Sequence, residues 1–369
     1  MPNPVPPGTS GTPVPFPISG GAAPLALTMG EPAGIGGEIA LMAWLARERD
    51  RLPPFFIIDD PARLAALARR LALAVPIREI GEPESARTAF RSALPVLTHP
   101  LPRSVEPGRP DPANADAVRR SIERAVELAR AKRVSGIVTN PIHKASLYKA
   151  GFPHAGHTEF LAALAHLTTP PVMMLACESL RVVPVTIHVS LAESIRSLTV
   201  GAIVTKAAIT AKALARDFGI RKPRLAVAGL NPHAGEGGNM GSEDETIVRP
   251  AIERLRERGI EASGPWPSDT MFAPRARETY DAAICMYHDQ ALIPIKTIAF
   301  DEAVNLTLGL PFVRTSPDHG TAFDIAGTGQ ARPDSLIAAI RMAARMAAMR
   351  ERADMTSGAG TDAFTGDGI

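Results

Sequence analysis

The stretch RLAVAGLNPHAGEGGNMGSEDETIVRPAIERLRER, residues 224–258, contains a short apolar run, then a glycine-rich loop, then an amphipathic segment. Arg224–Gly229 has the length and composition of a buried strand, and Glu243–Arg258 has the apolar periodicity of a helix. Short apolar runs followed by amphipathic segments recur along the chain. Strands that alternate with helices predict an α/β fold with a largely parallel sheet.

Similar segments lie on both sides of this stretch. Further strands are predicted for the apolar runs Pro24–Met29, Pro54–Ile58, Gly136–Thr139, Val172–Ala176, Val182–Ile187 and Ala282–Met286. Amphipathic helices are predicted between several of them, at Pro61–Leu73, Ala115–Lys132 and Val204–Asp217. A run rich in Ala, Met and Arg predicts a closing helix at Pro333–Arg350.

The segments that carry polar, chemistry-bearing residues occur in the middle of the chain and toward both ends, so the Pro- and Gly-rich linker Pro107–Pro112 is not taken as a domain boundary. We predict two α/β/α lobes that face each other across a cleft. The first comprises residues 24–140 plus 303–350, and the second residues 141–302 with the candidate metal ligands. Residues 1–23 are predicted to be a disordered Pro-rich tail, and residues 351–369 a flexible C-terminal tail.

Composition excludes several classes of partner. A net charge of +2 is too small for a nucleic-acid groove or a polybasic membrane anchor. No apolar run approaches the ~20 residues that span a bilayer. The first 23 residues carry no Lys or Arg, unlike a secretory or transit signal. Cys177 and Cys285 lie in apolar runs and are predicted to be buried free thiols, so a cytoplasmic location is expected.

Three histidines follow predicted strands: His188, His233 and His288. Ligands of open α/β sheets bind beyond the carboxyl ends of the strands, and neutral imidazole is a common zinc ligand. The loop Asn231–Gly241 packs four glycines around His233 and a glutamate, which lets backbone approach a ligand closely. A single histidine of this kind is more often an isolated polar residue in a loop, and it is the occurrence of three at strand ends that favours a metal site.

Candidate anion-binding residues come from two regions. His157 and Thr158 start a helix in the sequence GHTEF, where free N–H groups can hold an anion, although simple helix capping is an equal alternative. Lys296, Asn305 and Arg314 follow at intervals of nine residues, and Lys and Arg suit an acidic substrate. Solvated surface charge is the alternative, but Lys296 and Arg314 both lie in apolar surroundings.

The segment SPDHGTAFDIAGTG, residues 316–329, resembles the adenosine-binding loop of the isocitrate and isopropylmalate dehydrogenases. The opening GEPAGIGGE, residues 30–38, resembles the glycine-rich turn of the same enzymes, but it lacks the full Rossmann fingerprint. The resemblance implies that Asp324 bonds the adenosine ribose. A carboxylate there favours NAD over NADP, because no Lys or Arg lies between Thr315 and Ala331. The alternative is that Asp324 caps a following helix. The predicted cofactor-binding residues are His319, Gly320, Thr321, Ala322 and Asp324.

From about Pro24 to Arg350 the chain resembles the 4-hydroxythreonine-4-phosphate dehydrogenases of pyridoxal phosphate biosynthesis, the PdxA family. The resemblance rests on the ordered motifs GEPAGIG, GHTEF, NPHAGEGG, MYHDQ and VNLTLGLPFVRTSPDHGTA. It implies a fold similar to the isopropylmalate dehydrogenases and a homodimer with active sites at the subunit interface. It also implies one divalent metal per subunit, zinc being expected and magnesium or cobalt the alternatives. The implied metal ligands are His188, His233 and His288, and the implied substrate contacts are His157, Thr158, Lys296, Asn305 and Arg314.

The implied reaction is NAD-dependent, with NADP as an alternative cofactor. The secondary alcohol of 4-phosphooxy-L-threonine is oxidised to 2-amino-3-oxo-4-phosphooxybutanoate, which decarboxylates to 3-amino-2-oxopropyl phosphate. Lys296 and Asp269 are the candidate general bases. The alternatives are a dehydrogenase of 4-phospho-erythronate, 4-phospho-threonate or an aromatic cis-dihydrodiol dicarboxylate, a His-ligated metal hydrolase, and a non-catalytic binding protein.

Overall fold

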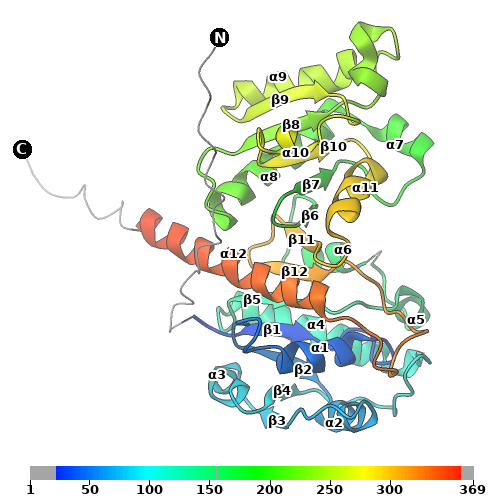
Figure 1. The fold of residues 1–369 in the computed structure, drawn as a ribbon, viewed down its shortest axis with the longest axis vertical. Helices are drawn as coiled ribbons and strands as arrows, with labels where there is room; N and C mark the ends of the chain where they lie inside the picture. Colours follow the sequence, from blue (N-terminus) through cyan, green and yellow to red (C-terminus); the bar gives the residue numbers. More distant parts are fainter. Residues whose placement is uncertain (1–21, 155, 359–369) are drawn as a thin grey trace, which may run out of the picture.

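The computed structural model describes residues 22–154 and 156–358. One sheet of twelve strands runs through this part of the chain, in the order β3-β4-β2-β1-β5-β12-β11-β6-β7-β10-β8-β9 (Figure 1). The strands are β1 (Leu25–Thr28), β2 (Phe55–Asp59), β3 (Ile77–Ile80), β4 (Leu94–Thr98), β5 (Gly136–Val138), β6 (Val172–Ala176), β7 (Arg181–Pro184), β8 (Arg224–Ala228), β9 (Glu261–Trp266), β10 (Ala282–Cys285), β11 (Val304–Leu308) and β12 (Arg314–Pro317).

Helices cover both faces of the sheet (Figure 1). They are α1 (Gly36–Leu45), α2 (Pro61–Arg70), α3 (Ala86–Phe90), α4 (Ala115–Arg130), α5 (Lys144–Lys149), α6 (His157–Leu164), α7 (Leu191–Ser197), α8 (Val200–Asp217), α9 (Arg249–Glu257), α10 (Pro274–Arg277), α11 (His288–Ala299) and α12 (Asp334–Gly358). The predicted α/β fold is confirmed. All seven predicted strands are present, with ends that differ by at most three residues.

Apolar side chains of the central strands alternate between two cores. In β1, Leu25 and Leu27 join the core under α1, α8, α9 and α12, whereas Ala26 joins the core under α4 on the opposite face. In β2, Phe55 and Phe56 divide in the same way. This two-sided burial explains why the strands appear in the sequence as continuous apolar runs rather than as alternating patterns.

The centre of the sheet departs from the predicted parallel arrangement. β11 runs antiparallel to both β12 and β6, and β6 is antiparallel to β7, while the other pairings are parallel. The sequence analysis missed β12 because it is rich in polar residues, and it also missed β3, β4, β9 and β11. β12 has the sequence RTSP, yet all four residues are buried between β5 and β11.

The pairing of β5 with β12 joins segments from opposite ends of the chain, Ile137 lying beside Arg314. This pairing agrees with a discontinuous first lobe. The sheet nevertheless continues through both predicted lobes, so their boundaries stay a prediction. Cys177 and Cys285 are free and buried, as expected, and burial raises the pKa of the Cys285 thiol.

The predicted N- and C-terminal tails can be compared with the structure only in part. Helix α12 continues to Gly358, so residues 351–358 extend the helix where a flexible tail was predicted. The rest of that tail, and residues 1–21 of the N-terminal one, lie outside the described residues. No single helix within residues 22–154 and 156–358 has the length and apolar composition of a membrane span; only α7 and α8 together do, bent by 93°.

Candidate functional site

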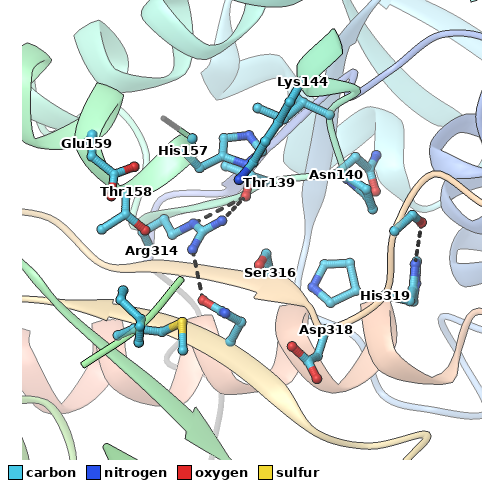
Figure 2. Close-up of a pocket in the computed structure, with 18 of the residues that line it drawn as sticks. Thr139, Asn140, Lys144, His157, Thr158, Glu159, Arg314, Ser316, Asp318 and His319 are labelled. Carbon is cyan, nitrogen blue, oxygen red and sulfur yellow. Dashed lines mark hydrogen bonds between the residues drawn. The ribbon is translucent and has the colours of Figure 1, made fainter. Parts of the chain in front are cut away.

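A cavity of about 310 Å³ opens near the carboxyl ends of β5 and β7 and beside β12. Its wall includes Thr139 and Arg314 from the predicted first lobe (Figure 2). Met173 and Ile187 from the predicted second lobe also line it. The strands therefore deliver polar side chains to one place although they are far apart in the sequence. Seven residues predicted from the sequence line the cavity: His157, Thr158, His188, Asn305, Arg314, His319 and Gly320.

Arg314 is a buried cation held by neutral acceptors. Its guanidinium donates to Thr139 Oγ1 at 2.6 and 3.2 Å, to Asn305 Oδ1 at 3.2 Å and to Thr307 Oγ1 at 3.0 Å. Within the described chain it forms no ion pair with a carboxylate. Burial lowers its pKa to about 10, so it stays charged at neutral pH. A buried charge without a counter-ion is costly, which favours binding of an anion in the cavity.

His157 and Thr158 occupy the first turn of α6 at the cavity wall. No side chain caps this helix, so the capping alternative is wrong and the first N–H groups of α6 remain available. The Nε2 atom of His157 is buried and has no hydrogen-bond partner among residues the structure describes. Burial, and then the charges of Arg314 and Lys144, hold the pKa of His157 well below its usual value, so the ring is neutral.

The three candidate metal ligands follow three neighbouring strands. His188, His233 and His288 come after β7, β8 and β10, and β10 pairs in parallel with both β7 and β8. The ring centroids of His188 and His288 lie 6.1 Å apart, with the ring planes tilted by 42°. Burial, followed by the charges of Lys144 and His288, lowers the pKa of His188, and a neutral imidazole is the metal-binding form.

His233 is not brought into this pair within one chain. Across residues 22–154 and 156–358, no three His, Cys, Asp or Glu side chains gather closely enough to hold a metal ion. His233 lies in the segment η3 (Pro232–Gly238), where five consecutive residues have left-handed backbone angles. Such angles cost a non-glycine residue ~1–2 kcal/mol. The buried carboxylate of Asp244 anchors the start of this segment, accepting from the N–H groups of Leu230 and Asn231 at 2.7 and 3.0 Å.

The two candidate bases occupy different surroundings. Lys296, on α11, lies outside the cavity wall but forms an ion pair of 2.9 Å with Asp318, which lines the cavity. Asp269 lies in an exposed turn after β9 and does not line the cavity. The geometry of one chain therefore brings Lys296 near the site through Asp318, and the assignment of the base stays a prediction.

The two segments that resemble isocitrate-type dehydrogenases contact each other. The N–H of Ile35 donates to the Thr321 carbonyl at 3.0 Å, and a Cβ added to Gly34 would lie 2.8 Å from that oxygen. Close approach therefore requires glycine at position 34. His319 and Gly320 line the cavity, and His319 Nε2 is buried without a partner in the described residues.

Asp324 is exposed, and the residues that follow it form turns rather than a helix. The helix-capping alternative for Asp324 is therefore wrong. The structure also brings a cation to this loop that the sequence analysis did not anticipate. Arg70, at the end of α2, donates to the Gly327 carbonyl at 3.1 Å. The absence of Lys and Arg between Thr315 and Ala331 therefore does not leave the loop without a cation.

Several cavity residues were missed by the sequence analysis: Thr139, Asn140, Lys144, Glu159, Ser316 and Asp318. For Thr139 and Asn140 a signal existed, because they end or follow a predicted strand at the ligand-binding edge of the sheet. Ser316 and Asp318 lie on or just after the polar strand β12, which the apolar pattern could not find. Glu159 belongs to the GHTEF motif but was given no role, and Lys144 lies in a short helix and carried no local signal.

Residues 51–343 match the family described as pyridoxal phosphate biosynthetic protein PdxA. A 4-hydroxythreonine-4-phosphate dehydrogenase from Bradyrhizobium diazoefficiens is 55% identical over 339 residues, covering 89% of this chain and 98% of that protein. The crystal structure of a 4-hydroxythreonine-4-phosphate dehydrogenase from Klebsiella pneumoniae has a TM-score of 0.80 at 38% identity, over 88% of this chain and all of that one. A terephthalate 1,2-cis-dihydrodiol dehydrogenase from Burkholderia xenovorans has a TM-score of 0.60 at 29% identity, covering 88% and 98%.

Proposed function

The chain belongs to the PdxA family, and from this premise we propose that it is an NAD-linked dehydrogenase of 4-phosphooxy-L-threonine in pyridoxine 5′-phosphate biosynthesis. The product is 2-amino-3-oxo-4-phosphooxybutanoate, a β-keto acid that loses CO₂ to give 3-amino-2-oxopropyl phosphate. The observation that carries this proposal is Arg314, a buried cation at the wall of a small cavity with no carboxylate partner in the described chain.

The substrate's anionic group is the natural counter-ion for Arg314. A phosphate monoester carries about −1.5 to −2 charges at neutral pH and accepts charge-assisted hydrogen bonds. His157 and Thr158 supply the start of α6 at the same wall, and Asn305 is bonded to the guanidinium. Lys296, paired with Asp318, would contact the substrate from α11. These groups bind and orient the substrate.

A divalent ion is proposed at His188 and His288, with His233 as the third ligand. Within one chain, only two of the three proposed ligands, His188 and His288, lie close together. Two imidazoles bound to one ion have centroids roughly 5–6 Å apart, given metal–nitrogen distances of ~2.0–2.1 Å, and the observed separation is 6.1 Å. Zinc is the expected ion, and magnesium or cobalt are the alternatives. When bound, the ion would supply Lewis-acid polarisation of the substrate hydroxyl.

NAD is the proposed cofactor, with NADP as the alternative. The buried, unpartnered Nε2 of His319 and the open space around Gly320 fit a ligand that enters the cavity from this side. Thr321, Ala322 and Asp324 continue the loop away from it. The nicotinamide, when bound, would accept the hydride. In this arrangement the loop orients the cofactor and the residues around Arg314 orient the substrate.

A homodimer with active sites at the subunit interface is proposed as the working unit. Large apolar side chains are exposed on or beside α7 and α11, among them Leu191 at 59%, Ile293 at 64% and Phe300 at 72%. Both helices lie on the same side of the second half of the sheet (Figure 1). Contiguous exposed apolar surface is typical of a protein–protein interface. This surface borders His188 and the start of α11, where a partner would complete the site.

We also propose a cytoplasmic location. Both cysteines are free and buried, which suits a reducing compartment. Immunoblotting of fractionated cells tests this proposal, and recovery of the protein in the periplasmic or membrane fraction would contradict it.

The test of the main proposal is turnover of purified full-length protein with NAD and a divalent ion. We expect NADH formation with 4-phosphooxy-L-threonine at a far higher kcat/KM than with 4-phospho-erythronate, 4-phospho-threonate or an aromatic cis-dihydrodiol dicarboxylate. A higher kcat/KM with one of the other substrates would show that the chain has a different substrate from the one proposed. Release of inorganic phosphate without nucleotide reduction would instead indicate the metal hydrolase.

A further inference from the structure

We propose that Lys144 is a second cation of the substrate site, which binds the phosphate group together with Arg314 and selects a doubly charged phosphate monoester over a singly charged acid. This inference rests on the proposed function, because it names the group that recognises the same substrate. The sequence analysis gave Lys144 no role.

The position of Lys144 follows from the strand that precedes it. β5 ends at Val138, and the chain runs along the cavity wall from Thr139 until α5 begins at Lys144. Lys144 is an exposed residue at the cavity wall, and its side chain extends toward Thr139 (Figure 2). A Cβ added to Gly156 would lie 3.4 Å from Lys144 Cε and 3.5 Å from Nζ. The ammonium therefore lies at the start of α6.

Two further observations agree with this placement. Lys144 and His157 both line the cavity, with the lysine side chain beside the imidazole (Figure 2), and the charge of Lys144 contributes to the lowered pKa of His157. Arg314 contributes at His157 as well. The imidazole of His157 is thus flanked by two cations, one from β12 and one from α5, and the neutral ring can donate or accept a hydrogen bond between them.

Neither cation forms an ion pair with a carboxylate among the residues that the structure describes. In the described part of the chain, Lys144 forms no ion pair, although Glu159 Oε2 lies on the same side, 3.5 Å from the Cβ position of Gly156. The other carboxylate at the wall, Asp318, is paired with Lys296. Two cations and the free N–H groups of α6 therefore face one cavity of about 310 Å³.

The chemistry of this group matches a phosphate monoester. Its three terminal oxygens can accept from the planar guanidinium, the ammonium and backbone N–H groups at the same time. A singly charged carboxylate has fewer acceptor positions and would leave one cation unpaired. The alternative role for Lys144 is the general base, because it lines the same cavity as His188, and the experiment must separate the two.

The experiment compares Lys144→Met, Lys144→Arg and the control Lys149→Met in full-length protein. Lys149 is exposed on the same short helix but does not line the cavity. Inorganic phosphate is the probe, and its affinity is measured by calorimetry. KM and kcat are measured with 4-phosphooxy-L-threonine. Thermal unfolding without ligand shows that the variants fold.

For Lys144→Met we expect the Kd for phosphate and the KM for 4-phosphooxy-L-threonine to rise by about 10- to 100-fold, because one charge-assisted hydrogen bond is lost. The kcat should change far less. Lys144→Arg should restore both to within about threefold, and Lys149→Met should match wild type. Unchanged phosphate affinity in a folded Lys144→Met would overturn the proposal. So would loss of kcat at normal KM in both Lys144 variants, which indicates a base. If wild type fails to oxidise the substrate, the proposed function fails, whereas phosphate affinity still decides the role of Lys144.

Discussion

Replacing Arg314 by Met removes a buried charge without creating a large cavity. We expect the variant to lose affinity for the phosphorylated substrate while the ligand-free protein keeps most of its stability. The matched control is Arg350→Met. Arg350 is also largely buried, but it forms an ion pair of 2.9 Å with Asp217, whose side chain is 1% exposed. The two arginines therefore differ in whether the fold provides a counter-ion.

The magnitudes follow from these surroundings. Burial lowers the pKa of Arg314 from 12.5 to about 10, and one pKa unit is ~1.4 kcal/mol, so holding the charge inside the fold costs about 3 kcal/mol. The hydrogen bonds to Thr139, Asn305 and Thr307 offset a similar amount. Arg314→Met removes the buried charge and these hydrogen bonds together, so it should change the free energy of unfolding by no more than ~1–2 kcal/mol. Arg350→Met removes one of the two arginines that pair with the buried carboxylate of Asp217. Arg216 remains at 2.7 Å, so the variant should cost ~2–3 kcal/mol, the loss of charge-assisted hydrogen bonds.

Substrate affinity should be lost in Arg314→Met and kept in Arg350→Met, the reverse of the order expected for stability. A charge-assisted hydrogen bond to an anion is worth ~1.5–3 kcal/mol, which raises KM for 4-phosphooxy-L-threonine about 10- to 150-fold in Arg314→Met. The KM for NAD should stay close to wild type, and Arg350→Met should leave both constants unchanged. Urea unfolding and steady-state kinetics measure the two effects. If Arg314→Met were as unstable as Arg350→Met and bound substrate normally, Arg314 would be a structural residue.

Four further outcomes are expected. His188→Ala, His233→Ala and His288→Ala should each lose bound metal, measured by elemental analysis, together with turnover; stoichiometric metal in all three variants would exclude this ligand set. Asp324→Asn should narrow the preference for NAD over NADP, measured as nucleotide Kd and kcat/KM, because the carboxylate that repels a 2′-phosphate is lost; an unchanged ratio would remove Asp324 from cofactor choice. Phe300→Asp should produce monomers in light scattering, whereas an intact dimer would place the interface elsewhere. The free energy of unfolding should fall as the pH is lowered from about 7.5 to 6. The pKa values of His157, His188 and His319 are lowered in the folded protein, so near the unfolded-state pKa of ~6.5 these rings bind protons in the unfolded chain but not in the folded one. A flat urea midpoint over this range would contradict the neutral state of these rings.

The predicted elements of the fold were those with strong local signals. β1 and β2 are uniformly apolar because helices cover both faces, and α4 alternates apolar and charged residues at helical spacing. β3, with the sequence IREI, lies at the sheet edge with both charged side chains exposed, so it lacks an apolar run. β12 lies in the middle of the sheet but faces the cavity with polar groups. Its burial depends on β5, which is distant in sequence, and no local window shows that.

The candidate site was predictable where chemistry lies at a strand end or in a motif. His157, His188, Asn305 and Arg314 were named from such positions, and all four line the cavity. What the sequence could not provide was contact between distant segments. The pairing of Lys296 with Asp318 and the reach of Arg70 to Gly327 depend on tertiary packing. His233 does not join the other two histidines among the described residues of one chain, so the proposed three-histidine site would require a partner subunit or a rearrangement.

The acceptors around Arg314 explain why the fold keeps a costly charge. A carboxylate in place of Thr139 would pair with the guanidinium and stabilise the ligand-free protein, but it would compete with every anion that enters the cavity. Thr139, Thr307 and Asn305 fix the orientation of the guanidinium without neutralising it. The same logic holds at Lys144, which forms no ion pair in the described chain. If a phosphate group binds as proposed, it supplies the counter-ion that the fold does not give Arg314 and Lys144. The electrostatic free energy that an internal carboxylate would have added to folding would then contribute to substrate binding.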